Sequence, residues 1–413
     1  MLKSWFAITL WKRILGMLVI GIVAGAWWGE GASSISWMGD IFIRLIRMVV
    51  VPLVFVTLVS GIVAMGDPKK LGSLGAKTMG LYICTTAFAI TIGLTLAAII
   101  QPGVGIELGS TSKEIAGAGS LAERLVGIIP TNPVAALAEG NMLAIIFFSL
   151  LLGIGILLTG KKAAPVAKLF DAASDVMIRV THLVMEVAPF GVFALIAGMV
   201  GEGGITKLFS VVPLVLAIAG GCFIHMFIVH GGIIKYLLKL PAVRFFQGVR
   251  GAQLVAFSTS SSAATLPVTM AVAEDNLGIK PAVASSVLPL GSTINMDGTA
   301  LYVGIVAVFA AQAFGISLGL TDYLLIAAST TLVSIGAAAV PSASLFLLAA
   351  VMQVIGVDAA QTAIVVGFLF PFDRPLDMLR TVVNVTGDLS VATAVGKWED
   401  ELDEESFRAA PVE

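Results

Sequence analysis

Charged residues are scarce in this chain, and their scarcity excludes a soluble protein. Asp, Glu, Lys and Arg make up 12% of the 413 residues, and apolar side chains make up 58% before the 44 glycines are counted. Soluble domains contain ~25% charged residues and ~45–50% apolar residues with glycine included. A soluble chain of this length could not bury so much apolar surface, so the sequence predicts an all-α polytopic membrane protein.

Cysteine and histidine are also rare, which argues against a disulfide scaffold or a metal site. Cys84 and Cys222 both lie in apolar runs and are interpreted as buried thiols. The three histidines show no metal-ligand spacing. His182 lies in an apolar helix and is interpreted as a core histidine, whereas His225 and His230 lie near the end of another apolar run.

Apolar runs long enough to cross a bilayer recur along the chain, and the pattern becomes irregular after about residue 242. The first run lacks a small-residue cleavage pattern, so we expect a retained helix. Lys and Arg follow the second, fourth and sixth runs, which places the N-terminus in the cytoplasm. The charge run 397–406 is interpreted as a solvated cytoplasmic end. The predicted spans are 12–29, 41–65, 78–101, 141–159, 170–200 and 207–234.

The remaining chain forms two segments of similar pattern, 242–316 and 317–396. Each has an interrupted apolar element ("AFSTSSSAATLPVTM", "SIGAAAVPSAS") followed by a helix that carries Asn, Asp and Gly together. Paired interruptions of this kind are typical of a transporter's binding site. A serine run can also be a flexible linker. Inside an apolar hairpin, however, a linker would expose unpaired backbone to lipid, so a loop tip that lines a cavity is favoured.

One polar stripe stands out in the stretch "DRPLDMLRTVVNVTGD". On a helix, its polar residues fall within about 80° of one another. Each charge at the bilayer centre costs ~2.5–3.5 kcal/mol, so these side chains must face protein, ions or water. By contrast, Asp322 and Asp358 are interpreted as helix caps at a membrane surface. The stripe consists of Asp373, Asp377, Arg380, Asn384 and Asp388.

The charges of the stripe allow two interpretations. In the first, Arg380 pairs with Asp377 or Asp373 and simply locks helices together. In the second, three acids of the stripe share one arginine, Arg374 lies to the side, and Asp297 adds a fourth acid. Surplus carboxylates suit a hard cation, and a guanidinium suits bidentate capture of a carboxylate. The second interpretation is favoured and predicts cation-coupled binding of an anionic solute.

These motifs resemble the glutamate/aspartate transporter family, the dicarboxylate/amino-acid:cation symporters that include the excitatory amino-acid transporters. "LIRMVVVPLVF" and "APFGVFALIA" are similar to its early spans. "SSSAATLP", "NMDGTALY", "SIGAAAVP" and "DMLRTVVNVTGD" are similar to its two re-entrant hairpins and its seventh and eighth helices. The resemblance covers nearly the whole chain and implies eight transmembrane helices plus two re-entrant helical hairpins, arranged as inverted repeats.

The resemblance also implies a homotrimer in which a transport domain moves against a scaffold. The scaffold would comprise 1–77 (helices one and two) and 102–200 (an extracellular loop and helices four and five). The transport domain would comprise 78–101 (helix three), 207–241 (helix six), 242–316 (first re-entrant hairpin and helix seven) and 317–396 (second re-entrant hairpin and helix eight). An acidic cytoplasmic tail, 397–413, would follow.

By resemblance, the stripe binds an acidic amino acid. Asp377 would hold its ammonium group and Arg380 its side-chain carboxylate, while Ser262 at the first hairpin tip would hold the main-chain carboxylate. The pure dicarboxylate branch tends to lack an acid at the position of Asp377, so the pair implies aspartate or glutamate. The implied substrate residues are Ser261, Ser262, Thr299, Asp377, Arg380, Thr381 and Asn384.

The resemblance further implies co-transported sodium ions at three positions. The first would use Asp388, Asn295 and Asn384. The second would use Ser334 with neighbouring backbone carbonyls under the second hairpin. The third would use Tyr82, Thr85, Thr86, Asn295 and Asp297.

Some residues depart from the family pattern. Ala339, Ser342 and Ser344 stand in a hairpin tip that usually contains glycines and are expected to stiffen it. Val303 replaces the glutamate of vertebrate members, so their proton co-transport and potassium counter-transport are not expected here.

The sequence therefore predicts a sodium-coupled importer of L-aspartate and/or L-glutamate in a prokaryotic plasma membrane, with no nucleic-acid partner. A proton-coupled glutamate or C4-dicarboxylate symporter of the same family is the alternative. From other classes, an intramembrane hydrolase using a serine of 260–262 lacks a nearby His or Lys and a nucleophile-elbow pattern. A passive anion channel would be contradicted by saturable, sodium-dependent uptake.

Overall fold

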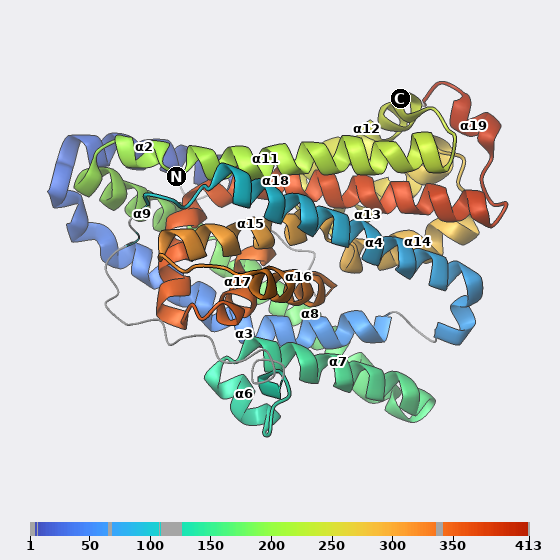
Figure 1. The fold of residues 1–413 in the computed structure, drawn as a ribbon, viewed down its shortest axis with the longest axis horizontal. Coiled ribbons are helices and arrows are strands. Elements are labelled where there is room, and N and C mark those ends of the chain that lie inside the picture. The colour runs from blue at the N-terminus through green and yellow to red at the C-terminus, as the bar shows by residue number, and fades with distance from the viewer. Residues whose placement is uncertain are drawn as a thin grey trace.

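The computed structural model describes residues 5, 7–64, 68–106, 108, 126–335 and 342–411 (Figure 1). Every regular element among these residues is a helix, and an isolated bridge joins Ile279 to Leu402. Five of the described helical stretches are long and apolar enough to cross a membrane. The prediction of an all-helical, polytopic membrane protein is confirmed, whereas eight crossings with two re-entrant hairpins stay a prediction. The five stretches are Leu10–Ala64, Gly72–Ile100, Met142–Met185, Val212–Leu237 and Pro281–Ala313.

The first four predicted spans each contain a long helix. A short 3₁₀ segment, η1 (Gly29–Ile35), joins the first two helices. A short helix, α6 (Pro133–Glu139), precedes the fourth and ends at Gly140, whose φ of +71° suits glycine. Asn141 then caps the next helix by accepting a hydrogen bond from the Ala144 N–H at 3.3 Å. The four long helices are α2 (Leu10–Trp28), α3 (Ser36–Ala64), α4 (Pro68–Ile100) and α7 (Met142–Thr159).

The predicted single span 170–200 is wrong, because the chain forms two helices there. These are α8 (Ala164–Met185), which follows η2 (Gly160–Ala163), and α9 (Ala188–Gly203). Pro189 lies in the first turn of α9, where its missing N–H is tolerated, and it could not continue the hydrogen-bond ladder of α8. The turn is held by Glu186, whose carboxylate accepts hydrogen bonds from Arg13 at 2.7 and 3.1 Å. α9 packs along α2, and the two lie together at one end of the molecule in Figure 1.

The sixth predicted span contains an irregular helix. It begins with α10 (Thr206–Phe209) and α11 (Val212–Ile224) and continues as two π-helical segments, η3 (His225–His230) and η4 (Ile233–Leu237). A π-helical turn closes i→i+5 hydrogen bonds and is rare, occurring mostly at functional sites. Apolar periodicity does not reveal such a segment, because every residue in it fits an ordinary apolar helix.

The first segment of the C-terminal half is interrupted where the sequence predicts, whereas residues 336–341 of the predicted interruption in the second lie outside the described residues. In the first, α12 (Ala242–Thr259) and α13 (Ser262–Asp275) form a hairpin, and the following helix is broken at residues 295–296 into α14 (Pro281–Ile294) and α15 (Asp297–Ala313). In the second, α16 (Leu320–Ile335) packs against α17 (Ala343–Val354), and a single long helix, α18 (Ala359–Trp398), follows. Ala339 lies outside the described residues.

The polar stripe lies inside the protein. α18 runs along the long axis of the molecule (Figure 1) and packs against α12, α13, α14, α15 and α17. All residues of α15 from Asp297 to Ala311 are buried. Large apolar side chains such as Val23, Leu158 and Leu216 are instead exposed on the outer helices, as expected of a surface that meets lipid.

Two residues that were expected in the core lie at the surface. Cys84 is exposed, whereas Cys222 is buried as predicted. His182 is exposed on α8 and is not a core histidine. A long apolar helix has an outward face as well as an inward face, and residue type alone does not say which face a residue occupies. Asp358 caps α18 in a capping box with Gln361, as predicted, and Asp322 accepts a hydrogen bond from the Gly319 N–H at 2.8 Å.

The acidic tail is not simply solvated, which corrects the interpretation of residues 397–406. It folds back to form a short helix, α19 (Glu404–Arg408), whose Phe407 side chain is fully buried. Three ion pairs hold the tail to the helix ends. Together with the buried side chain of Phe407, they explain why this run of charged residues forms ordered structure. They are Lys77–Glu399 at 2.8 Å, Lys280–Glu401 at 2.9 Å and Lys397–Glu404 at 2.6 Å.

Candidate substrate and ion site

The buried side of α18 holds all five residues of the predicted stripe. Arg380 is the largest side chain among the fully buried residues. Its Nη2 atom donates hydrogen bonds to Asp373 Oδ1 and Asp377 Oδ1, both at 2.9 Å. The guanidinium carbon lies 3.9 Å from the centroid of the Tyr302 ring, a cation–π contact that fixes its plane. The pairing of Arg380 within the stripe, which was the less favoured interpretation, is therefore present.

This pairing does not exhaust the donors of Arg380. Its Nε and Nη1 atoms are buried and have no hydrogen-bond partner among the described residues. Buried donors are normally satisfied, and each one left unpaired costs ~1–3 kcal/mol. The guanidinium can therefore accept a further anionic ligand as well as its two aspartates.

Arg374 changes the count of charges on the stripe. It is buried, and its Nη1 atom lies 3.6 Å from Asp377 Oδ2. Asp373 and Asp377 are thus balanced by two arginines, and the assumption that three acids share one arginine is wrong at this end. The unbalanced carboxylates are those of Asp388 and Asp297, which lie in the cluster of predicted sodium ligands.

The second hairpin reaches the stripe through Ser342. Its backbone N–H donates to Asp377 Oδ2 at 2.9 Å, and its φ of +60° lies in the left-handed region that favours glycine. Asp377 therefore binds both the hairpin and Arg380. A serine with a positive φ has a strained backbone, and strained residues of this kind cluster at functional sites. Whether Ser342 and Ser344 stiffen the hairpin stays a prediction.

The broken helix approaches α18 closely at Gly298. Its N–H donates to Asn384 Oδ1 at 2.8 Å, and a Cβ atom there would lie only 2.5 Å from the backbone oxygen of Arg380. Thr299, the next residue, is buried beside this contact. Thr381 is buried on α18, where its hydroxyl donates to the backbone oxygen of Asp377 at 2.8 Å. α13, which begins at Ser262 with Ser261 as its N-cap, also packs against α18.

A second group of oxygen atoms meets where α4, the helix break and α18 come together. Asn295 Nδ2 donates to Asp388 Oδ1 at 3.0 Å, and Thr85 Oγ1 lies 3.4 Å from Asn295 Oδ1. Thr86 Oγ1 donates to Asp297 Oδ1 at 2.7 Å. Carboxylate, amide and hydroxyl oxygens are the ligands that hard cations prefer. The structure thus brings together buried residues that are far apart in the sequence.

The hydroxyls of two predicted sodium ligands, Tyr82 and Ser334, donate hydrogen bonds to backbone oxygens. The Tyr82 hydroxyl donates to the Val287 backbone oxygen at 3.1 Å. Ser334 lies in the last turn of α16, where its hydroxyl donates to Thr331 O at 3.0 Å within the same helix. These contacts do not connect Ser334 to the other predicted ligands.

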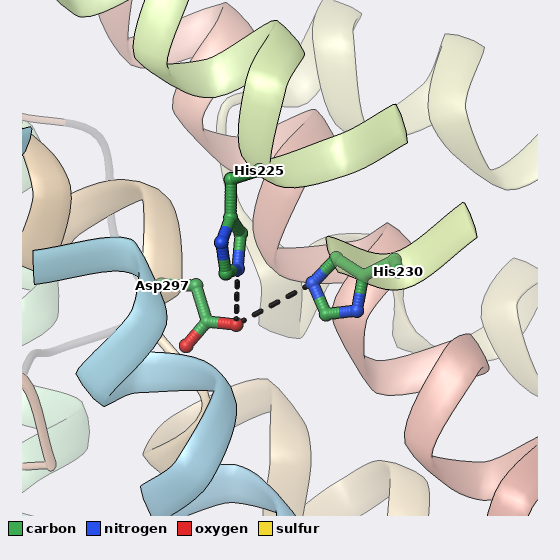
Figure 2. A group of neighbouring side chains, drawn as sticks. All are labelled: His225, His230 and Asp297. Carbon is green, nitrogen blue, oxygen red and sulfur yellow. Dashed lines mark hydrogen bonds and ion pairs between the residues drawn. The ribbon is translucent and has the colours of Figure 1, made fainter. Parts of the chain in front are cut away.

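The residues that sequence reasoning missed are two histidines. His225 Nε2 lies 2.9 Å and His230 Nε2 lies 3.5 Å from Asp297 Oδ2, and all three side chains are fully buried (Figure 2). Taken on an α-helix, their spacing in the sequence gave no sign that the two rings converge, and they do so because η3 is a π-helix. Two side chains five positions apart point ~140° away from each other on an α-helix. On a π-helix, which has a wider turn, they point toward the same face. The only sequence signal was their separation by five residues in an apolar run.

A cavity of about 1130 Å³ lies away from the stripe. Its lining comes from α3, α9, α15 and α18 and from residues 106 and 108. The polar residues of the lining are Asp40, Arg44, Arg47 and Glu202. The cavity separates helices of the predicted scaffold from helices of the predicted transport domain, and its lining includes none of the predicted substrate or sodium residues.

Comparison with known proteins places this arrangement among transporters. The sodium:dicarboxylate symporter family model matches residues 10–398. The chain is 36% identical to the proton/sodium-glutamate symport protein of Geobacillus stearothermophilus, covering 96% of this chain and 95% of that one. It is 35% identical to the proton/glutamate-aspartate symporter of Escherichia coli (95% and 93% covered). It is 32% identical to the C4-dicarboxylate transport protein of Rhizobium meliloti (97% and 92% covered).

Proposed function

The chain belongs to the sodium:dicarboxylate symporter family, and from this premise we propose that it imports L-aspartate and/or L-glutamate together with sodium by alternating access. It is a membrane symporter and not an enzyme. The observation that carries the choice of substrate is the buried pair of Arg380 and Asp377, which lie 2.9 Å apart. This pair offers one cationic and one anionic group side by side.

An acidic amino acid can replace both partners of that pair at once. Its side-chain carboxylate takes the guanidinium of Arg380, whose Nε and Nη1 atoms have no described partner. Its ammonium group takes the carboxylate of Asp377, which would exchange a bond from Arg380 for one from the substrate. Each buried charge keeps an opposite charge, so the exchange avoids the ~3–5 kcal/mol cost of leaving one of them uncompensated.

A pure dicarboxylate would use the site less well. It adds a second anionic group beside Asp377 and brings no cationic group, so the carboxylate of Asp377 would still depend on Arg380 at 2.9 Å, the Ser342 N–H at 2.9 Å and the more distant Arg374. The acid at position 377 therefore favours an amino acid over a C4-dicarboxylate. The main-chain carboxylate would bind at the first hairpin tip, where Ser262 begins α13.

The surplus carboxylates support coupling to a hard cation. Asp388 and Asp297 lie among amide and hydroxyl oxygens from Asn295, Thr85 and Thr86. Each net positive charge that enters through 100 mV supplies ~2.3 kcal/mol, which corresponds to about 50-fold accumulation. More than one sodium ion per anionic substrate would therefore make import both electrogenic and steep.

The moving part would comprise helices three and six and the two interrupted segments, 242–316 and 317–396. The cavity between α3 and α9 on one side and α15 and α18 on the other supports a boundary between scaffold and moving helices. We further propose a homotrimer in a prokaryotic plasma membrane with both termini in the cytoplasm. The mass of the purified protein in detergent, corrected for bound detergent, tests the trimer.

The test of the transport proposal is uptake of labelled L-aspartate into proteoliposomes. We expect uptake under an inward sodium gradient and none under a proton gradient alone. Uptake driven by protons alone would keep the substrate and refute sodium coupling. The absence of uptake under both gradients, from protein that still binds another ligand, would refute the acidic amino-acid substrate.

The second candidate is a proton-coupled or C4-dicarboxylate symporter. The names of two relatives support this candidate, since one is a proton/glutamate-aspartate symporter and the other is a C4-dicarboxylate transport protein. Labelled succinate in the same two gradients distinguishes it. Faster uptake of succinate than of aspartate would replace the primary proposal.

A further inference from the structure

His225 and His230, which have no role in the proposed transport cycle, form a compact cluster with Asp297, which is also a proposed sodium ligand. Both imidazole rings and the carboxylate point toward one another in Figure 2, although the histidines come from η3 and the aspartate from α15. One ligand atom from each residue lies within 4.8 Å of the other two. All three side chains are fully buried.

The distances suit a metal ion bound between the three side chains. Tetrahedral zinc lies ~2.0–2.2 Å from its nitrogen and oxygen ligands, which places the ligand atoms ~3.3–3.5 Å apart. The two nitrogen–oxygen distances in the cluster are 2.9 and 3.5 Å. The two imidazole nitrogens lie within 4.8 Å of each other, so binding an ion would require the rings to approach each other by up to about 1.5 Å.

An unsatisfied nitrogen points to the same conclusion. His230 Nε2 is buried and makes no hydrogen bond of good geometry to a described residue, although it is directed at Asp297 (Figure 2). Buried polar atoms nearly always have a partner, so one without a partner requires an explanation. A metal ion would satisfy this nitrogen, and coordination would replace the hydrogen bond between His225 Nε2 and Asp297 Oδ2 at 2.9 Å.

The local backbone is built for this convergence. On an α-helix, residues 225 and 230 would point ~140° apart. η3 is π-helical from His225 to His230, and the wider turn directs both rings at one carboxylate. π-helical segments are rare and occur mostly at functional sites, and this one brings two potential metal-binding side chains together.

We propose that His225, His230 and Asp297 bind one divalent transition metal ion of the zinc, cobalt or nickel type. Two imidazole nitrogens and one carboxylate suit these ions, whereas sodium and calcium prefer oxygen ligands throughout. The fourth position is left to water or to a neighbouring hydroxyl. The metal would be held inside the moving helices and not at the surface.

This site shares a carboxylate with a proposed sodium position, and that consequence rests on the proposed function. The other oxygen of Asp297 accepts a hydrogen bond from Thr86 at 2.7 Å. A divalent ion on Oδ2 draws the carboxylate charge away from sodium at the third position. Zinc should therefore inhibit uptake, and raising the sodium concentration should relieve the inhibition.

The direct test is a titration of purified protein with Co²⁺, followed by the visible absorption of four-coordinate cobalt and by displacement with Zn²⁺. We expect one ion per chain. His225→Gln and His230→Gln each keep an N–H donor but remove an imidazole, and each should weaken binding at least as much as the 10–100-fold that loss of an outer-shell partner costs. His182→Gln is the matched control, since His182 is exposed on α8 and should leave binding unchanged.

Three outcomes would overturn the proposal. The absence of the cobalt spectrum in the unmodified protein refutes the site without depending on any variant. Equal binding by the unmodified protein and both η3 variants refutes the assigned ligands, as does equal loss in His182→Gln. Binding that does not inhibit aspartate uptake refutes the shared carboxylate. Because the titration needs no transport, it is independent of failure of the proposed function.

Discussion

The exchange of ion-pair partners at Asp377 predicts a change of substrate in the variant Asp377→Asn. This substitution keeps the shape of the side chain and removes its charge. Arg380 would still be paired, because its Nη2 atom also donates to Asp373 at 2.9 Å. The variant should therefore fold, and its defect should lie in binding the substrate's ammonium group.

The size of the defect follows from the burial of the pair. Asp377 is only 7% exposed, so the substrate's ammonium group would enter a site without an opposite charge. Removing one partner of a buried ion pair costs ~3–5 kcal/mol, which corresponds to an affinity loss of roughly 150-fold to 5,000-fold. Succinate has no ammonium group, so its affinity should stay the same or rise.

The assay is equilibrium binding of aspartate and of succinate to the purified protein in saturating sodium. Asp373→Asn is the matched control, because it removes the other partner of Arg380 and should affect both ligands similarly. Equal losses for aspartate and succinate in Asp377→Asn would refute the assignment of the ammonium group. A larger loss of aspartate affinity in Asp373→Asn would move that assignment to Asp373.

Three further predictions concern packing and the tail. Gly298→Ala places a Cβ atom 2.5 Å from the backbone of α18 and should lower the stability by about 1–3 kcal/mol, measured by thermal melting. Gly80→Ala is the control, because a Cβ atom there meets nothing within 4 Å. Equal melting temperatures of the two variants would contradict the close approach. Phe407→Ala removes a fully buried ring and should weaken docking of the tail by about 3–5 kcal/mol, seen as faster hydrogen exchange in α19 with α18 unchanged. Lys397 lowers the pKa of Glu404 below its ordinary value of 4.5, so the charged form is favoured in the folded tail. Its stabilising effect is present above that value and is lost as the pH falls through the lower folded pKa. The protection factor of the tail, which is the intrinsic exchange rate at each pH divided by the observed rate, should therefore be constant from pH 7 to 5 and fall only in stronger acid.

Much of the fold could be predicted because its signals are local. Apolar length predicts the early helices, and interruptions by Ser, Asn and Gly predict the hairpin at 260–261 and the break at 295–296. The stripe on α18 was also predictable, since a helix places residues at i, i+4 and i+7 on one face. The division of the predicted span 170–200 was missed, although Pro189 was its visible signal.

The composition and order of residues determined that this chain is an all-helical membrane protein with an ionisable stripe in its interior. Those conclusions rest on costs that each segment bears by itself: apolar surface in water, and charge or unpaired backbone in lipid. Only the tertiary structure decided which charges meet. It placed Arg374 near Asp377 and directed two histidines at Asp297. Such pairings depend on how helices distant in sequence pack and on a local change of helical pitch, and hydrophobic periodicity records neither of them.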